Sequence, residues 1–123
     1  FEPRASLDQR GSVTKNVPDL ERVHALLSFS YKTEIELNRA LMEKYTRRFD
    51  EGVLTPAEAS LIKLASSEMQ GRVADKCVQL FGGYGYMKEY KISRFYLDAR
   101  IQRIYGGTSE IMKELISRSM VGR

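Results

Sequence analysis

The chain has few of the residues that small proteins use for covalent or metal cross-links. Its 123 residues include one cysteine, Cys77, and one histidine, His24. A single cysteine cannot form an internal disulfide, and these two residues cannot build a His/Cys zinc site. A Ser-His-Asp triad is excluded unless it uses His24. We therefore expect no bound metal, and a reducing compartment, the cytoplasm, is the default location.

Long apolar runs and signals for β-strands are also missing. No run of 18 apolar residues exists that could span a membrane, and the first residues lack the charged-then-apolar pattern of a signal peptide. No alternating segments joined by a two-residue turn indicate a hairpin. Hydrophobic residues make up 42% and charged residues 29%, a composition typical of one globular domain and not of a disordered chain.

The net charge of +4 is concentrated in the last third of the chain. Residues 86–123 carry eight bases and four acids, whereas acids and bases balance over residues 1–85. A local positive excess favours an anionic partner, such as a phosphorylated cofactor, and a solvated surface without a partner is the alternative. The bases form no continuous stripe on one helix and no nucleic-acid motif is present, so we expect no nucleic-acid partner.

Two long amphipathic helices are predicted in the first two thirds of the chain. Apolar residues recur every four positions over 19–50, with Asp19 as a plausible N-cap. The second half of this pattern, after a shift of register, consists of Leu37, Leu41, Tyr45 and Phe49. The next helix starts at a capping box over 55–58 (TPAE), with proline at the first helical position. Its apolar stripe consists of Leu61, Ala65, Met69, Val73, Cys77 and Phe81.

Two glycine pairs divide the rest of the chain. The pair at 82–83 must end the second long helix and opens a loop, because two glycines make a helix costly to continue. The pair at 106–107 separates two shorter helices, the last of which has Thr108 as its N-cap. We predict an all-α fold, an up-and-down helical bundle over residues 19–123, preceded by an extended lead-in over residues 1–18.

Both glycine pairs are candidate binding sites. The segment 106–109 (GGTS) places small residues before a helix, whose free N–H groups and positive dipole end favour an anion. The alternative is a plain turn in which Thr108 caps its own helix. At the other pair, Gly82 and Gly83 let another group approach the main chain, and Gln79 supplies an amide that both donates and accepts. The alternative there is a C-cap followed by a turn.

These residues resemble the C-terminal helical domain of the acyl-CoA dehydrogenases. The matching segments, in the order and spacing of that family, are 77–86 (CVQLFGGYGY), 98–101 (DARI) and 104–111 (IYGGTSEI). The resemblance covers roughly residues 18–121. It implies a tetramer whose C-terminal helical domains pack together at the centre, with each FAD held partly by one subunit and partly by its neighbour.

The resemblance also implies roles for individual residues. The first glycine segment is expected to contact the ADP part of FAD across the subunit boundary, and the second to contact FAD from the other side. Tyr105 is expected near the acyl pocket. The expected cofactor-binding residues are Gln79, Gly82, Gly83, Thr108 and Glu110.

The resemblance fails at the catalytic base. The family's reaction removes a proton alpha to a thioester while a hydride leaves the beta carbon for the flavin, and it needs a carboxylate whose pKa is raised. Gly106 occupies the usual position of that base, and the glutamate used by another branch of the family would precede Phe1. We therefore expect no catalytic residue in this chain. Glu110 is expected to favour the helix dipole or bond a ribose hydroxyl instead.

Two functions follow from this interpretation. In the first, the chain is the C-terminal domain, as a fragment or a split subunit, of a FAD-dependent acyl-CoA dehydrogenase acting on an acyl-CoA thioester. It would be inactive alone and would form a tetramer-like homo-oligomer, or a hetero-oligomer with a chain bearing the N-terminal and β domains. In the second, it is a non-catalytic helical oligomerisation module derived from that family.

Three further residues have expected roles outside the glycine pairs. Arg100 and Arg103 are either phosphate contacts or surface ion-pair partners. Cys77 is expected to be a small core residue.

Overall fold

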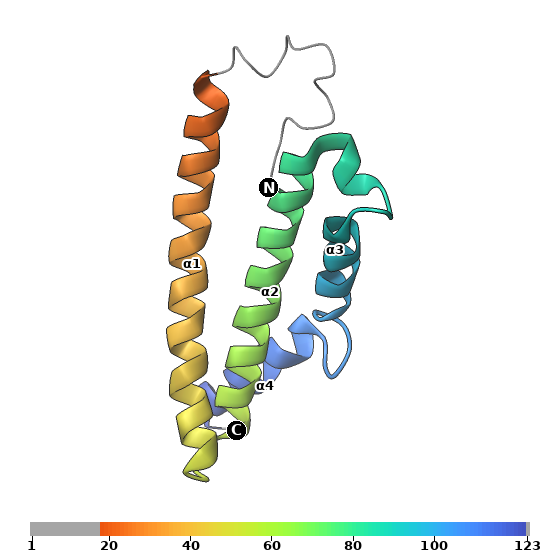
Figure 1. Cartoon of the computed structure of the whole chain (residues 1–123). Coiled ribbons are helices and arrows are strands. Elements are labelled where there is room, and N and C mark those ends of the chain that lie inside the picture. The colour runs from red at the N-terminus through yellow and green to blue at the C-terminus, as the bar shows by residue number, and fades with distance from the viewer. Residues whose placement is uncertain (1–17, 123) are drawn as a thin grey trace.

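The computed structural model describes residues 18–122, and side chains from residue 31 onward. The described part is helical and contains no strand, which confirms the all-α prediction (Figure 1). The 3-10 helix η1 covers a segment predicted as a loop. The elements are α1 Pro18–Asp50, α2 Pro56–Phe81, η1 Gly82–Tyr86, α3 Lys91–Ile101 and α4 Ser109–Val121. Because α1 includes Pro18, Asp19 lies in its first turn instead of preceding it, and most of the predicted lead-in lies outside the described residues.

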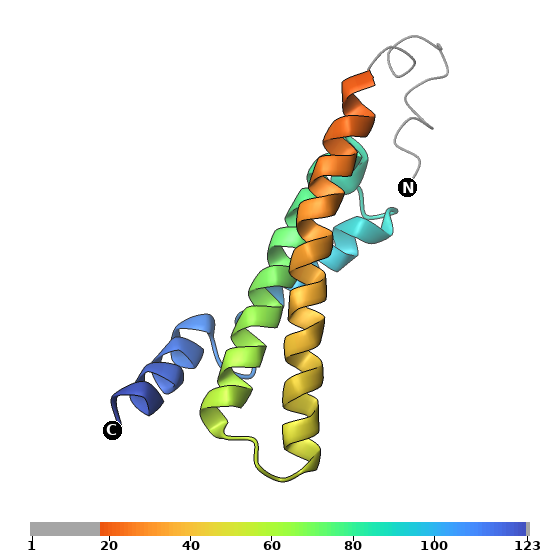
Figure 2. The ribbon, with the colours of Figure 1, turned by 90° about the vertical axis from the view of Figure 1, so that its left-hand side faces the viewer.

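The helix α2 forms the centre of the fold. It runs antiparallel beside α1, and it contacts η1, α3 and α4 (Figure 1). The two short helices pack on α2 and not on α1. The far end of α4 leads away from the α1–α2 pair (Figure 2). Every candidate site residue is therefore positioned by its relation to α2.

The start of α2 is fixed by the capping box that the sequence predicts. The Glu58 main-chain N–H donates to Thr55 Oγ1 (3.2 Å), and the Thr55 N–H donates back to Glu58 Oε2 (2.9 Å). The Glu58 carboxylate also lies 3.0 Å from Arg48 Nε at the end of α1. The connection between the two long helices is thus held by hydrogen bonds from main-chain N–H groups to side-chain oxygens and by an ion pair.

The interior is built largely from small side chains. Along α2 the buried residues are Ser60, Ser67 and Ala74, spaced seven apart, so they share one face of the helix. Ala99 of α3 is 1% exposed. The predicted apolar stripe of α2 is only half-buried. Small residues let helices approach closely, but they remove little apolar surface from water.

The second half of the α1 stripe is only partly confirmed. Tyr45 is buried, but Leu37 and Phe49 are 68% and 69% exposed. A spacing of four residues drifts by about 40° per step, so the two ends of a four-member stripe lie about 120° apart on the helix. Only its middle can face α2, and its ends turn toward solvent.

Candidate functional site

The segment 79–83, here the 79–83 joint, leaves main chain open to solvent. Gly82 has φ +60°, and its N–H donates to the Gln79 carbonyl as the C-cap of α2. A Cβ built on Gly82 or on Gly83 would have no atom within 4 Å. Both glycines and the Gln79 side chain are exposed. The positive φ accounts for Gly82, and the free space at both positions allows a ligand to lie against the main chain.

Gly85 has a structural role that the sequence analysis missed. It is buried, and a Cβ there would lie 2.5 Å from the Val78 carbonyl oxygen and 3.0 Å from Phe81 Cβ. Tyr90 packs edge-on against Phe81, with ring centroids 6.4 Å apart, and is tilted against Tyr84 at 5.1 Å. The turn of η1 onto the end of α2 therefore requires glycine at 85.

The two glycines of the segment 105–110, here the 105–110 joint, differ in their surroundings: a Cβ built on Gly106 would meet no atom within 4 Å, whereas a Cβ on Gly107 would clash with the Met112 Cε methyl group. Gly106 has φ +65° and Gly107 φ +110°, values that side-chain-bearing residues rarely adopt. Thr108 is the N-cap of α4, and its Oγ1 accepts a bond from the Ile111 N–H (3.3 Å), as predicted. The Ser109 hydroxyl is buried and has no hydrogen-bond partner within the described part of the chain.

Lys63 of α2 holds the 105–110 joint in place. Its ammonium group donates to the Tyr105 carbonyl (3.0 Å) and to the Gly107 carbonyl. Tyr105 and Gly107 follow Lys63 in the sequence by 42 and 44 positions, respectively. The only sequence signal for this role is a single charge within the apolar stretch 61–65 (LIKLA). Lys63 therefore fixes both carbonyls that flank Gly106.

Glu110 lacks the raised pKa that a catalytic base needs. It is exposed and is the second residue of α4. A hydrogen bond from its own main-chain N–H lowers the pKa of its carboxyl group, and the Thr108 side chain, Lys113 and Arg103 lower it further. A carboxylate stabilised in this way is a poor proton acceptor near neutral pH.

Tyr105 and Cys77 differ in accessibility. The Tyr105 side chain is 53% exposed, and its hydroxyl donates to Gln102 Oε1 (2.6 Å). Cys77 is half-buried, and burial raises the pKa of its thiol. A raised pKa keeps the thiol protonated and unreactive, in keeping with a packing role.

No cluster of histidine, cysteine, aspartate and glutamate that could hold a metal occurs among the described residues.

The two joints of one chain lie far apart. Lys63, which binds the 105–110 joint, precedes Gly82 by 19 positions along α2. At about 1.5 Å per residue, the joints are on the order of 20–30 Å apart. The structure therefore brings Gln79, Gly82 and Gly83 together at one place and Thr108 and Glu110 together at another. One phosphate group cannot contact both sets within a single chain.

The chain matches a known protein family over most of its length, including both joints. Residues 22–121 match the family described as acyl-CoA dehydrogenase, C-terminal domain. The chain belongs to this family. The match includes both joints and all four helices, so the resemblance stated from the sequence is confirmed.

Full-length relatives are much longer than this chain. The long-chain specific acyl-CoA dehydrogenase of Sus scrofa, named as mitochondrial, is 46% identical over 120 residues, which are 98% of this chain and 28% of that protein. The caffeyl-CoA reductase-Etf complex subunit CarC of Acetobacterium woodii is 34% identical over 89% of this chain and 28% of its own length. The chain thus spans less than a third of the length of these two relatives.

Solved acyl-CoA dehydrogenases share the fold. The acyl-CoA dehydrogenase from Geobacillus kaustophilus superposes with a TM-score of 0.78 at 38% identity, over 91% of this chain and 29% of that one. Butyryl-CoA dehydrogenase from Megasphaera elsdenii gives a TM-score of 0.70 at 36% identity, over 73% of this chain and 24% of that one. Among the described residues of our chain, no helix is both long and apolar enough to cross a membrane.

Proposed function

We propose that this chain is the FAD-contacting and oligomer-forming C-terminal part of an acyl-CoA dehydrogenase. It would contribute to the alpha,beta-dehydrogenation of an acyl-CoA thioester. The observation that carries this proposal is the open main chain at Gly82 and Gly83, where a Cβ would meet no atom within 4 Å. Open main chain at these glycines lets the phosphates and sugars of a dinucleotide approach the backbone closely.

The residues at both joints fit a flavin dinucleotide. Gln79 is exposed beside Gly82 and Gly83 and can bond an adenine or ribose edge. Thr108 and the buried, unpartnered hydroxyl of Ser109 stand at the N-terminal end of α4, where the helix dipole favours an anion. FAD, when bound, supplies the acceptor for the substrate's hydride. The role of this chain is to bind and orient the cofactor.

The separation of the joints supports a site built from two protomers. One protomer would provide its 79–83 joint and the other its 105–110 joint, in a tetramer-like homo-oligomer. A hetero-oligomer with a chain that bears the N-terminal and β domains is the alternative arrangement. Exposed apolar side chains provide a surface for either assembly. The largest exposed fractions belong to Tyr86, Met120, Phe49, Val121 and Leu37.

Chemistry by this chain alone is not expected. Gly106 has no side chain to accept a proton, and the carboxylate nearest to it in sequence, Glu110, has a lowered pKa. Tyr105, with its exposed ring, is the residue that we place against the acyl group. The base and the rest of the substrate site would have to come from elsewhere in the complete enzyme. A cytoplasmic location stays a prediction.

A second candidate function is a non-catalytic oligomerisation module. The same exposed apolar surface favours it, because a monomer would leave residues such as Leu37 and Phe49 in water. In that case the helices would assemble without flavin, and the joints would be simple turns between helices.

Flavin retention separates the two functions. The chain is mixed with FAD, alone and together with a chain bearing the N-terminal and β domains, then desalted, and flavin absorbance and light scattering are measured. We expect retained flavin in an oligomer, and less than a tenth as much with Gly83→Asp, which adds a negative charge in open space. Flavin-free oligomers in both mixtures would favour the second function and contradict the first.

A further inference from the structure

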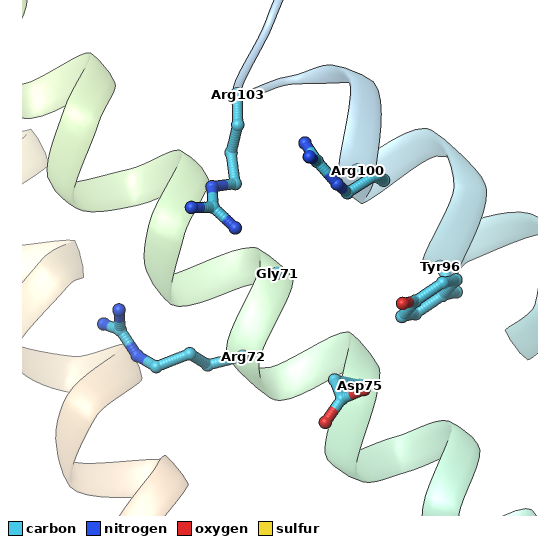
Figure 3. Close-up of a pocket in the computed structure, with 6 residues that line it drawn as sticks. All are labelled: Gly71, Arg72, Asp75, Tyr96, Arg100 and Arg103. Atoms are coloured by element: carbon cyan, nitrogen blue, oxygen red, sulfur yellow. The ribbon is translucent and has the colours of Figure 1, made fainter. Parts of the chain in front are cut away.

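A groove rich in arginine lies between α2 and α3, next to the 105–110 joint, whose Ser109 N–H donates to the Arg103 carbonyl (3.1 Å). Its volume is about 260 Å³, and its lining consists of Gly71, Arg72, Asp75, Tyr96, Arg100 and Arg103 (Figure 3). Neither the 79–83 joint nor the 105–110 joint contributes a residue to it. Three guanidinium groups and one carboxylate line this space, so its lining carries a net positive charge.

Two of the guanidinium groups are turned toward the same space. Arg100 projects from α3 and Arg103 from the turn that follows it, and both side chains line the space beside Gly71 of α2 (Figure 3). Arg100 forms no ion pair with any described residue. Arg103 forms one long ion pair, in which its Nη2 lies 3.9 Å from Glu68 Oε1, and Glu68 also pairs with Arg72 and Lys113. Like charges in this arrangement repel each other unless an anion lies between them.

Arg103 also has an unused donor. Its Nε is buried and has no hydrogen-bond partner in the described part of the chain. Its aliphatic portion lies over Gly71, where an added Cβ would be 3.7 Å from Arg103 Cδ. A buried N–H without a partner is uncommon in native proteins and points to a ligand or water at that position.

The groove has three other polar residues, Arg72, Asp75 and Tyr96, of which only Asp75 carries a negative charge. Arg72 turns away toward α1, where its Nε donates to Glu34 Oε1 (3.0 Å). Asp75 lies at the edge of the groove and forms no ion pair with the described residues (Figure 3). Tyr96 of α3 directs its hydroxyl end toward α2, where the hydroxyl can donate to an anion (Figure 3).

We propose that this groove binds a phosphate-bearing small molecule. The planar guanidinium groups of Arg100 and Arg103 would each bond two phosphate oxygens, and the Tyr96 hydroxyl would donate to a third. Arginine suits phosphate because its N–H groups match the spacing of the oxygens. Two guanidinium groups side by side match a doubly charged phosphate better than a singly charged carboxylate. The proposal does not depend on flavin binding at the joints.

The test is a titration of the 123-residue chain with pyrophosphate, inorganic phosphate and acetate in low salt. Binding is followed by calorimetry and by the NMR signal of the Arg103 Nε–H group, which is identified by its loss in Arg103→Lys. We expect saturable binding of one pyrophosphate per chain, weaker binding of phosphate, and no saturation with acetate. Arg100→Gln and Arg103→Gln should each weaken pyrophosphate binding at least tenfold.

Arg94→Gln is the matched control, because Arg94 lies on α3, is exposed and does not line the groove. It removes the same charge and should leave binding unchanged. Circular dichroism melting shows whether each variant is folded, and Arg103→Lys, which keeps the charge, supplies a second test at that position. Equal loss of binding in Arg94→Gln and Arg100→Gln, or equal response to acetate and pyrophosphate, would show general charge attraction and overturn the proposal.

Discussion

Lys63 and Gly107, 44 positions apart in the sequence, are joined by a hydrogen bond from the lysine ammonium group to the glycine carbonyl. The same ammonium group bonds the Tyr105 carbonyl at 3.0 Å. One side chain of α2 thus determines where the main chain around Gly106 lies. In this acyl-CoA dehydrogenase domain, position 106 is a glycine. We therefore assign Lys63 to positioning the main chain around Gly106 and not to catalysis.

Replacing Lys63 tests this assignment. Lys63→Met keeps an unbranched side chain but removes both bonds, and we expect the free energy of unfolding to fall by about 2 kcal/mol, as for other hydrogen bonds from charged groups. Flavin binding should weaken further, because the 105–110 joint loses its anchor. Lys76→Met is the control, because Lys76 lies exposed on the same helix. Equal stability and equal flavin binding in the two variants would contradict the role of Lys63.

The glycines around the end of α2 should differ sharply in their tolerance of alanine. Gly85→Ala places a Cβ 2.5 Å from the Val78 carbonyl oxygen, and overpacking of this kind costs about 1–3 kcal/mol. Gly83→Ala meets no atom within 4 Å and should be neutral or slightly stabilising. Urea unfolding of both variants measures the difference. Similar urea midpoints for Gly85→Ala and Gly83→Ala would mean that η1 does not pack on α2 as described.

The capping box should make stability depend on acid pH. The bond from the Thr55 N–H is the main cause that lowers the pKa of Glu58 below the usual 4.5, followed by the Thr55 hydroxyl and Arg48. A lowered pKa means that the stabilising contribution of Glu58 is complete above pH 4.5 and is lost as the pH falls through the folded-state value.

Thermal unfolding of the wild-type chain and Glu58→Gln should therefore differ most at neutral pH and converge in acid. Thr55→Ala removes the other half of the box and should cost about 1 kcal/mol at neutral pH. A difference in melting temperature between wild type and Glu58→Gln that stays constant from neutral pH down to strong acid would argue against a role for the ionised Glu58 carboxylate.

The features that the sequence predicted correctly depend on neighbours in the chain. The Thr55–Glu58 box and the Thr108 cap involve residues three apart, so residue type and spacing are enough to find them. The family resemblance in turn rests on short segments that include both glycine pairs. Residue order within those segments is enough to locate the two candidate joints along the chain.

Features that depend on distant residues could not be found in this way. Nothing in the sequence pairs Lys63 with Gly107, or brings Arg100 and Arg103 together beside Gly71. The exposure of Leu37 and Phe49 depends on how far α1 rotates relative to α2, which a spacing of four does not specify. Tertiary packing decides each of these, and sequence periodicity reports only on single helices.

We propose that one flavin is held by the 79–83 joint of one protomer and the 105–110 joint of another. A mixture of two variants, each altered at one joint, tests this shared site. Gly83→Asp places a negative charge in open space at the first joint. Thr108→Asp adds a negative charge at the second joint while keeping a good N-cap residue. Each variant alone should lose flavin binding.

After unfolding and refolding together, half of the two-protomer units are mixed, and each mixed unit has one site with both joints intact. We expect that FAD binding, measured at equilibrium by flavin fluorescence, recovers to about a quarter of the wild-type level. A mixture that binds no more FAD than the two variants refolded separately would contradict the shared site.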